Sequence, residues 1–501
     1  MSELPKGWVA VKAEGICEKV QSGSTPRNNP FTEHGDIPYL KVYNIVNQKI
    51  AFDYKKQFIS NEIHQEKLSR SKVLPNDVLM NIVGPPLGKV AIVGNEFPEW
   101  NINQAITLFR PKQDFLSHRF LYYFLNEGSA VKSVHGDLKG SVGQVNISLS
   151  QCRNFDVPVP PLTEQKRIVE KLDEVLAQVD TIKARLDGIP DLLKRFRQSV
   201  LASAVSGKLT QEWRTKNSGF ERSSDLLKRW LSERKNNFHK EQERLIEDGR
   251  IKRARKYKEP VKPNLEKSPE LFPETWTTVS VSQFAECLDS MRIPVKKEDR
   301  ASARGLYPYF GANGLVDKVD EYIFDDELVL VTEDETFYGR TKPIAYRSSG
   351  KCWVNNHAHV LRASTKAAND YLCYALMYKN VEPWLSGSTG RAKLTQAALN
   401  EIPLGLPPEG ELNQIVGLVG QFLSFADTIE AQVKKAQARV DNLTQSILAK
   451  AFRGELVEQG PNDEPADKLL ERIAEARKEA EALAKAAKKA EAAKKRAAKS
   501  A

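Results

Sequence analysis

The chain has 501 residues, which is enough for two to four domains and for more than one hydrophobic core. Its formal charge of +10 and its pI of about 9.1 favour an anionic partner such as nucleic acid. The five cysteines form no C-x-x-C pair, which argues against a disulfide framework and a zinc ribbon. With no signal peptide and no apolar run long enough to span a bilayer, a cytoplasmic location is expected.

Residues 1–160 are predicted to form a first mixed domain. Short apolar runs bounded by Gly, Pro, Asn or Asp indicate strands at 36–45, 77–82 and 88–93, and a short helix is expected around 119–125. A Gly-rich polar stretch follows at 140–146. Its backbone amides and its Gln and Asn side chains suit contacts to phosphates and base edges, although a flexible loop is the alternative.

Residues 161–213 are predicted to be one long helix. Thr163 can cap its first turn, and apolar residues then recur at alternating spacings of four and three from Ile168 to Val200. This spacing is typical of a coiled-coil seam. Proline lacks an amide donor and clashes with the preceding turn, so we expect a break or a kink at Pro190.

The remaining chain divides into four parts. Residues 214–269 are predicted to be a charged linker or insertion, because residues 228–263 hold 13 Lys or Arg against 6 Asp or Glu. A second mixed domain at 270–407 has predicted strands at 327–332 and 343–346, a helix at 371–378 and a Gly-rich stretch at 387–393. A second long helix at 408–457 precedes an Ala/Lys/Glu-rich helix or disordered tail at 458–501.

The chain contains an internal repeat. Residues 155–209 align without a gap with residues 402–456 at an offset of 247, with 17 identities in 55 pairs. Because the second copy repeats the apolar seam, from Ile415 to Ile447, the two helices are predicted to form an antiparallel coiled coil. The fold class is therefore α+β, with two mixed α/β domains separated by two long helices. Such a pseudo-two-fold chain suits duplex DNA.

Enzymatic motifs are weak or missing. Gly84–Lys89 resembles a phosphate loop but is one residue short between its glycines and contains two prolines. Glu333, Asp334 and Glu335 can be a metal site, although a solvated or DNA-facing edge is favoured. His357 and His359 share a face of a predicted strand without an evident third ligand, which favours a packed or hydrogen-bonded pair. No metal site and no catalytic residue are therefore predicted.

The sequence resembles the specificity subunit of Type I restriction-modification systems, most closely the Type IA group. The matching motifs open and close the two helices, and others lie in the second domain. They are Pro158–Gln165, Leu193–Leu201, Gly207–Thr210, Phe310–Gly314, Trp353–His359, Ala426–Glu430 and Asn442–Leu456. The resemblance covers roughly residues 1–212 and 270–457.

The resemblance implies a non-catalytic subunit with two target recognition domains, each reading one half of a bipartite, asymmetric DNA site. The helices are expected to set the unread spacer and to dock two methyltransferase subunits, which restriction/translocase subunits join. No cofactor is expected on this chain, since S-adenosylmethionine, ATP and Mg²⁺ would belong to those partners. The expected DNA-binding residues are Lys41, Asn44, Asn81, Lys89, Lys139, Gln144, Asn146, Asn313, Arg340, Lys342, Arg391 and Lys393.

Two alternatives remain open at this point. One is a free-standing DNA-binding scaffold without partner subunits. The other is a divergent metal-dependent nuclease that uses Glu333, Asp334 or Glu335. The bases read by each half and the spacer length do not follow from the sequence.

Overall fold

A computed structural model describes residues 4–134, 146–217, 219–269, 271–296, 298, 300, 305–335, 337–387, 392–475 and 478–479. The candidate residues Lys139, Gln144 and Arg391 lie outside this described part. The chain forms two compact units, and the two ends of the chain belong to the same one. Residues 1–187 and 435–501 make up unit 1, and residues 188–434 make up unit 2.

Unit 1 contains two four-stranded sheets. Every residue of β3 (Ile37–Leu40) and of β8 (Val78–Asn81) is buried. The first sheet has the order β2 (Cys17–Ser22), β11 (Ile106–Pro111), β8 (Val78–Asn81), β9 (Val90–Ile92), and the second β6 (Phe58–Ile59), β3 (Ile37–Leu40), β10 (Trp100–Ile102), β7 (Lys72–Val73). Two further pairs are β1 (Val9–Lys12) with β12 (Asp156–Val159) and β4 (Ile45–Val46) with β5 (Lys49–Ile50).

Short helices complete unit 1. Helix α3 (His118–Glu127) buries Phe120, Leu121 and Phe124 on one face and ends at Gly128, whose φ of +86° suits glycine. Its neighbours are α1 (Ala13–Ile16), α2 (Asn61–Gln65), α4 (Ser129–Ser133), α5 (Leu149–Arg153) and the 3₁₀ turns η1 (Val42–Asn44) and η2 (Ser69–Ser71).

Unit 2 is built on one six-stranded sheet. Its order is β14 (Ala285–Cys287), β19 (Ala358–Ala363), β17 (Phe324–Thr332), β18 (Ala345–Val354), β15 (Tyr307–Gly311), β16 (Gly314–Val319), and β13 (Thr277–Ser280) pairs separately with β20 (Pro403–Leu406). The helices are α7 (Gln211–Lys216), α8 (Ser223–Glu247), α9 (Val281–Phe284), α11 (Lys366–Met377) and α12 (Gln396–Glu401), with turns η4 (Asp289–Met291) and η5 (Glu382–Trp384).

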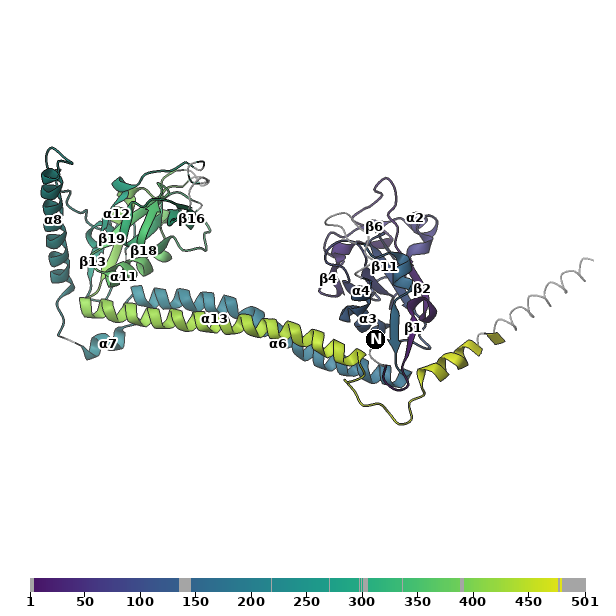
Figure 1. The fold of residues 1–501 in the computed structure, drawn as a ribbon. Coiled ribbons are helices and arrows are strands. Elements are labelled where there is room, and N and C mark those ends of the chain that lie inside the picture. Colours follow the sequence, from purple (N-terminus) through teal and green to yellow (C-terminus); the bar gives the residue numbers. More distant parts are fainter. Residues whose placement is uncertain are drawn as a thin grey trace, which may run out of the picture. The chain divides into compact units, whose positions relative to one another are not determined.

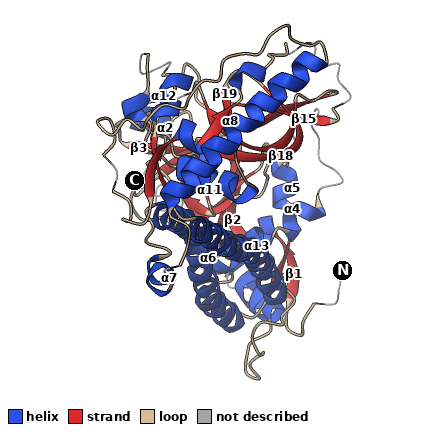
Figure 2. Ribbon diagram, turned by 90° about the vertical axis from the view of Figure 1, so that its left-hand side faces the viewer, coloured by secondary structure: helices blue, strands red, loops and turns tan. Residues whose placement is uncertain are grey.

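Two helices of 44 residues, α6 (Leu162–Val205) and α13 (Glu409–Phe452), run side by side (Figures 1 and 2). In unit 1, Lys183 forms an ion pair with Asp441 at 2.7 Å, and in unit 2, Arg197 pairs with Asp427 at 2.6 Å. Between these two ion pairs the residue number rises along α6, from 183 to 197, and falls along α13, from 441 to 427, so the helices are antiparallel. The predicted fold class is confirmed.

Pro190 does not interrupt α6, so the expected break is absent. The division between the units falls at this point of the helix, between Asp187 and Gly188. The seam residues of α6 are also less buried near this point: Ile182 is 46% exposed, whereas Leu172 and Val179 are buried.

The charged segment at 214–269 is not only a linker. It contains α8, whose Leu226 and Trp230 are buried in the core of unit 2. The guanidinium of Arg234 donates to the carbonyls of Ser282 and Phe284 at the end of α9. Figure 1 shows α8 running along one side of unit 2.

The end of each long helix meets the start of a sheet-containing region through the same contact. A Cβ on Gly207, after α6, would lie 2.5 Å from Cγ of Pro273, and a Cβ on Gly454, after α13, would lie 2.5 Å from Cγ of Pro5. Both glycines have a positive φ, +74° and +72°. Any side chain at these positions would clash, which explains why the repeat keeps glycine at both.

Part of the C-terminal segment is folded against unit 1. Asp463 forms an ion pair with Arg167 at 2.5 Å, and residues 466–475 are helical with Ala466 and Leu469 buried. Within the described part of the chain, no helix combines the length and the apolarity that crossing a bilayer requires.

Candidate nucleic-acid interface

In unit 2 three candidate residues lie together beyond the end of β17. The Arg340 guanidinium donates to Oδ1 of Asn313 at 2.6 Å and to the carbonyl of Lys342 at 3.1 Å. Asn313 lies in the hairpin turn between β15 and β16 and also donates to Glu335. The Lys342 side chain is exposed and has no ion-pair partner among the described residues. The two loops therefore form one polar surface with a free ammonium group.

Lys393 joins this region through Glu333. Its Nζ lies 2.8 Å from Oε1 of Glu333, and its backbone pairs with that of Ser386. This hydrogen bond raises the pKa of Lys393, so its charge is secure at neutral pH. Burial alone would raise the pKa of Glu333, but the bonds from Lys393 and Arg292 outweigh it and leave that pKa below its usual value. Lys393 thus holds the edge of the Gly-rich stretch in place.

The buried histidine of the predicted pair does have two carboxylates nearby. Nδ1 of His359 lies 2.5 Å from Oδ2 of Asp289, its Nε2 lies 2.7 Å from the Leu394 carbonyl, and Glu333 is also close. One ligand atom each from Asp289, Glu333 and His359 fall within 4.8 Å of one another. However, the Arg292 guanidinium contacts Asp289 at 3.2 Å and Glu333 at 2.5 Å. A fixed cation already balances this site, so it favours a structural ion network over a metal centre.

The three adjacent acids are each engaged by the fold. They follow β17 rather than lying on it. Glu333 faces Arg292 and Lys393, Asp334 accepts from the exposed His357 at 2.8 Å, and Glu335 accepts from Asn313. The structure therefore gives the nuclease alternative no free carboxylate cluster among the described residues. His357 and His359 are both hydrogen-bonded, as predicted, but they do not share a strand face, because β19 begins at Ala358 and His357 lies in the preceding turn.

Next to Arg340, the long helix contributes basic residues that sequence reasoning did not select. A cleft of about 480 Å³ is lined by Arg340, Thr341 and Tyr378 and, from α6, by Asp191, Lys194, Arg195 and Gln198. Both helix cations are exposed. Both belong to a motif of the repeat region. Only the fold places them beside the loop of Arg340, which lies 145 positions after Arg195 in the sequence.

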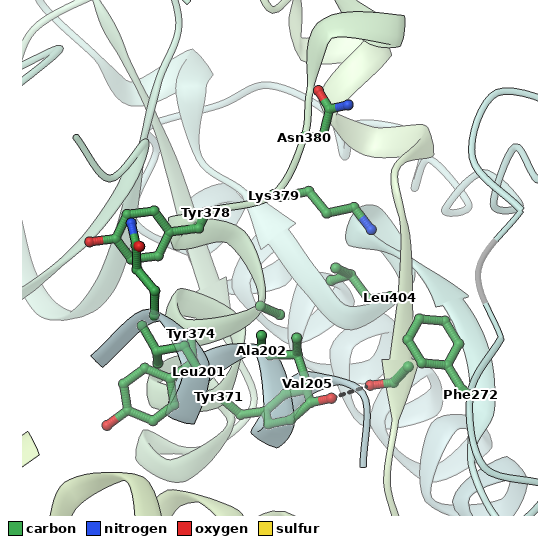
Figure 3. Close-up of a pocket in the computed structure, with 13 residues that line it drawn as sticks. Leu201, Ala202, Val205, Phe272, Tyr371, Tyr374, Tyr378, Lys379, Asn380 and Leu404 are labelled. Carbon is green, nitrogen blue, oxygen red and sulfur yellow. Dashed lines mark hydrogen bonds between the residues drawn. The ribbon is translucent and has the colours of Figure 1, made fainter. Parts of the chain in front are cut away.

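A second, more apolar cavity of about 220 Å³ is lined by residues of α6 and α11 (Figure 3). Leu201, Ala202 and Val205 of α6 face Tyr371 and Tyr374 of α11. The Tyr371 hydroxyl donates to the Gly405 carbonyl at 2.7 Å. This hydrogen bond joins α11 to β20.

In unit 1 one asparagine organises the loop that follows β8. The Asn81 side chain is buried, donates to the Pro86 carbonyl at 2.9 Å and accepts from the Lys89 amide at 2.6 Å. Asn146, which is exposed, pairs with Val83 through an isolated bridge. The structure thus brings Lys89 and Asn146 to one loop cluster, and Asn81 holds that cluster from inside.

Asn44 has the same internal character. It is buried, its Oδ1 accepts from the Lys41 amide at 2.9 Å, and its Nδ2 donates to the Tyr54 carbonyl at 2.8 Å. Lys41 lies over the Phe31 ring at 4.2 Å, and partial burial lowers its pKa. Lys41 has no ion-pair partner among the described residues, whereas the Asn44 amide is fully used within the fold.

The sequence model of the Type I restriction modification DNA specificity domain matches residues 5–191 and 273–437. The chain is 30% identical to the Type I restriction enzyme EcoKI specificity subunit of Escherichia coli K12, over 95% of this chain and 96% of that protein. It is 29% identical to the StySPI specificity subunit of Salmonella potsdam, over 95% and 96%.

Solved structures share the fold. A chain from a study of complex assembly and conformational transition of the type I R-M system aligns over 91% of this chain and 100% of its own, with a TM-score of 0.60 and 18% identity. The HsdS subunit from Thermoanaerobacter tengcongensis aligns over 90% and 98%, with a TM-score of 0.52 and 18% identity.

Proposed function

The chain belongs to the Type I restriction modification DNA specificity family, and we propose on that premise that each of its units reads one half of a bipartite DNA site. Recognition of DNA sequence in a Type I restriction-modification system is the function that its relatives carry by name. One observation supports the division of labour: the two family segments, 5–191 and 273–437, fall on sheets of different units.

The loops of the two units differ in chemistry, which supports two different half-sites. Unit 1 offers Lys41, Lys89 and Asn146. Unit 2 offers Arg340 and Lys342, with Lys194 and Arg195 beside them. Arginine pairs with guanine and asparagine with adenine in the major groove, so unlike polar sets select unlike sequences.

The partners follow from the same premise. We propose that the paired helices set the unread spacer and dock two methyltransferase subunits, which restriction/translocase subunits join. S-adenosylmethionine, ATP and Mg²⁺ would be bound by those partners. This chain would contribute no catalytic group, and its ion network at Asp289, Glu333 and His359 would serve the fold.

The decisive experiment is to co-express the chain with methyltransferase subunits of its system and to map methylated adenines across the host genome. A single motif of two short specified sequences separated by a fixed unread gap is expected. Methylation without such a gap would contradict the assignment of one half-site to each unit. Failure to co-purify with methyltransferase subunits would favour the free-standing scaffold, and cleavage of DNA by the purified chain with Mg²⁺ would favour the nuclease.

A further inference from the structure

A basic segment that follows α8 is held in an extended path on the surface of unit 2. Helix α8 ends at Glu247 and is followed by Gly249, whose φ is +69°, and the Arg250 amide donates to the Leu245 carbonyl at 2.9 Å. The chain then reverses and returns along the helix. We call residues 250–262 the basic strap; none of them lies in a regular helix or strand.

The basic strap is clamped at successive points. The Arg255 amide donates to the Gln242 side chain at 2.9 Å, and the Tyr257 ring packs on Phe238 with centroids 5.3 Å apart. Further along, the Val261 carbonyl accepts from the Ser280 hydroxyl at 2.7 Å. These contacts fix the backbone to α8 and to the start of the unit 2 core, so its side chains are presented on a defined surface.

The side chains so presented are almost all cations. The basic strap has seven Lys or Arg and one acid, Glu259, which is itself paired with Lys235 of α8 at 2.8 Å. All seven cations are exposed, and none of them has an ion-pair partner among the residues that the structure describes. They are Arg250, Lys252, Arg253, Arg255, Lys256, Lys258 and Lys262.

This arrangement favours a polyanion over a protein surface. Seven like charges in 13 residues repel one another, and holding them in place adds to that cost unless an opposite charge is brought in. Protein interfaces are enriched in aromatic side chains and Arg but depleted of Lys, which supplies four of the seven cations, and the one aromatic residue of the strap, Tyr257, faces α8. Protein–DNA interfaces are strongly positive and gain affinity by releasing counterions from phosphates.

We propose that the basic strap binds backbone phosphates of duplex DNA that flanks the half-site read by unit 2. This goes beyond sequence recognition, because phosphate contacts position a duplex without reading it. The strap would add affinity that is independent of sequence and depends on salt. It would also help to align the duplex before the bases are read.

The test replaces Lys252, Arg253, Lys256 and Lys258 by Gln in the full chain, which leaves the Tyr257 anchor intact. DNA affinity is measured at several salt concentrations on two duplexes. The first ends at the outer edge of the unit 2 half-site, and the second continues for about 20 base pairs. Binding of the long duplex should weaken, with the slope of log K against log salt reduced by roughly 0.9 for each phosphate that the variant no longer neutralises. Binding of the short duplex should not change.

A matched control changes four other exposed cations of unit 2 to Gln, none of which has an ion-pair partner among the described residues: Lys208, Lys216, Arg222 and Lys366. Equal melting temperatures would establish that both variants fold. Equal losses on the short and long duplexes, or the same loss in the control variant, would overturn the proposal. So would an unchanged salt slope accompanied by loss of methyltransferase subunits on co-purification, which would make the partner a protein. If the chain reads no sequence, the length and salt dependence can still be measured on arbitrary duplexes, so the two proposals can fail separately.

Discussion

The indole nitrogen of Trp276 donates a hydrogen bond to Oε2 of Glu411 at 2.9 Å. The same contact occurs in unit 1, where Trp8 donates to Glu164 at 3.1 Å. Each glutamate lies in the first turn of a long helix. The repeat therefore keeps the contact that joins each long helix to its sheet-containing unit, but the two glutamates have different surroundings.

The different surroundings predict opposite effects of the same substitution. Glu411 also contacts the Arg214 guanidinium and accepts from Thr210 at 2.6 Å, so Glu411→Gln should cost about 2 kcal/mol of stability. Burial raises the pKa of Glu164 above its ordinary 4.5, although the Trp8 bond opposes this. Because the pKa of Glu164 is higher in the folded than in the unfolded chain, protonation of Glu164 stabilises the fold. This stabilisation is fully present below the ordinary pKa of 4.5 and is lost as the pH rises through the pKa of the folded state.

Glu164→Gln should therefore become stabilising relative to the parent as the pH rises above that value, since the amide still accepts from Trp8 without a buried charge. Calorimetric unfolding of both variants at pH 4 and pH 8 measures this. Parallel behaviour of Glu164→Gln and Glu411→Gln at both pH values would contradict the assignment of different roles.

Unit 2 should lose stability in acid through its buried ion network. Burial tends to raise the pKa of Asp289, but the bond from His359 and the neighbouring Val360 amide and Arg292 leave it below its usual value, and the pKa of Glu333 is also lowered. Depressed carboxyl pKa values give stability that is present above the unfolded values and lost as the pH falls through the folded ones. Arg292→Met removes the shared cation, so the acid limb of the unfolding curve should move to higher pH. If the acid limb did not move, Arg292 would not be what lowers the pKa values of Asp289 and Glu333.

Substitutions at Asn81 and at Lys89 should have different effects, the first on the stability of the fold and the second on DNA binding. Asn81→Ala leaves the Lys89 amide and the Pro86 carbonyl without their buried partner, at a cost of about 2 kcal/mol in unfolding free energy. Lys89→Ala should leave stability unchanged and weaken DNA binding. Chemical unfolding and a DNA titration of each variant provide the comparison. Normal stability of Asn81→Ala would mean that its side chain is available for DNA after all.

The paired helices should set the unread gap. Inserting seven residues after Asp187 and seven after Lys434, where the two units divide, adds one heptad to each helix and keeps the seam in phase. The added rise of about 10 Å should lengthen the gap by roughly three base pairs without altering either half-site. Methylation mapping reads this directly. An insertion in α6 alone is the control and should impair assembly; altered bases in either half would refute the division of labour.

Two further substitutions address the Gly-rich stretches, whose residues Gln144 and Arg391 lie outside the described part of the chain. Arg391→Ala should impair only one half-site and Gln144→Ala only the other, because removing a base-specific hydrogen bond costs roughly 1–3 kcal/mol at its own position. Methylation of duplexes mutated in either half distinguishes this from a phosphate contact, whose removal would weaken all sequences equally.

The long helices and the repeat could be predicted because their periodicity extends over many turns. The role of individual loop residues could not. Asn44 and Asn81 lie within the predicted strands at 36–45 and 77–82, yet each side chain serves backbone groups that only the fold brings near. The sequence did not predict α8 because the segment is highly charged and only two of its apolar residues, Leu226 and Trp230, are fully buried. The carboxylate facing His359 comes from Asp289, 70 positions away.

The contacts of Gly207 with Pro273 and of Gly454 with Pro5 have a topological consequence. The segment after each long helix returns to the residues that open a sheet-containing region, so the contact pattern forms a closed cycle in which neither half comes first. Packing alone does not dictate the order of the halves along the chain. A rearranged gene that places the second half before the first, joined by a short linker, would encode the same set of contacts.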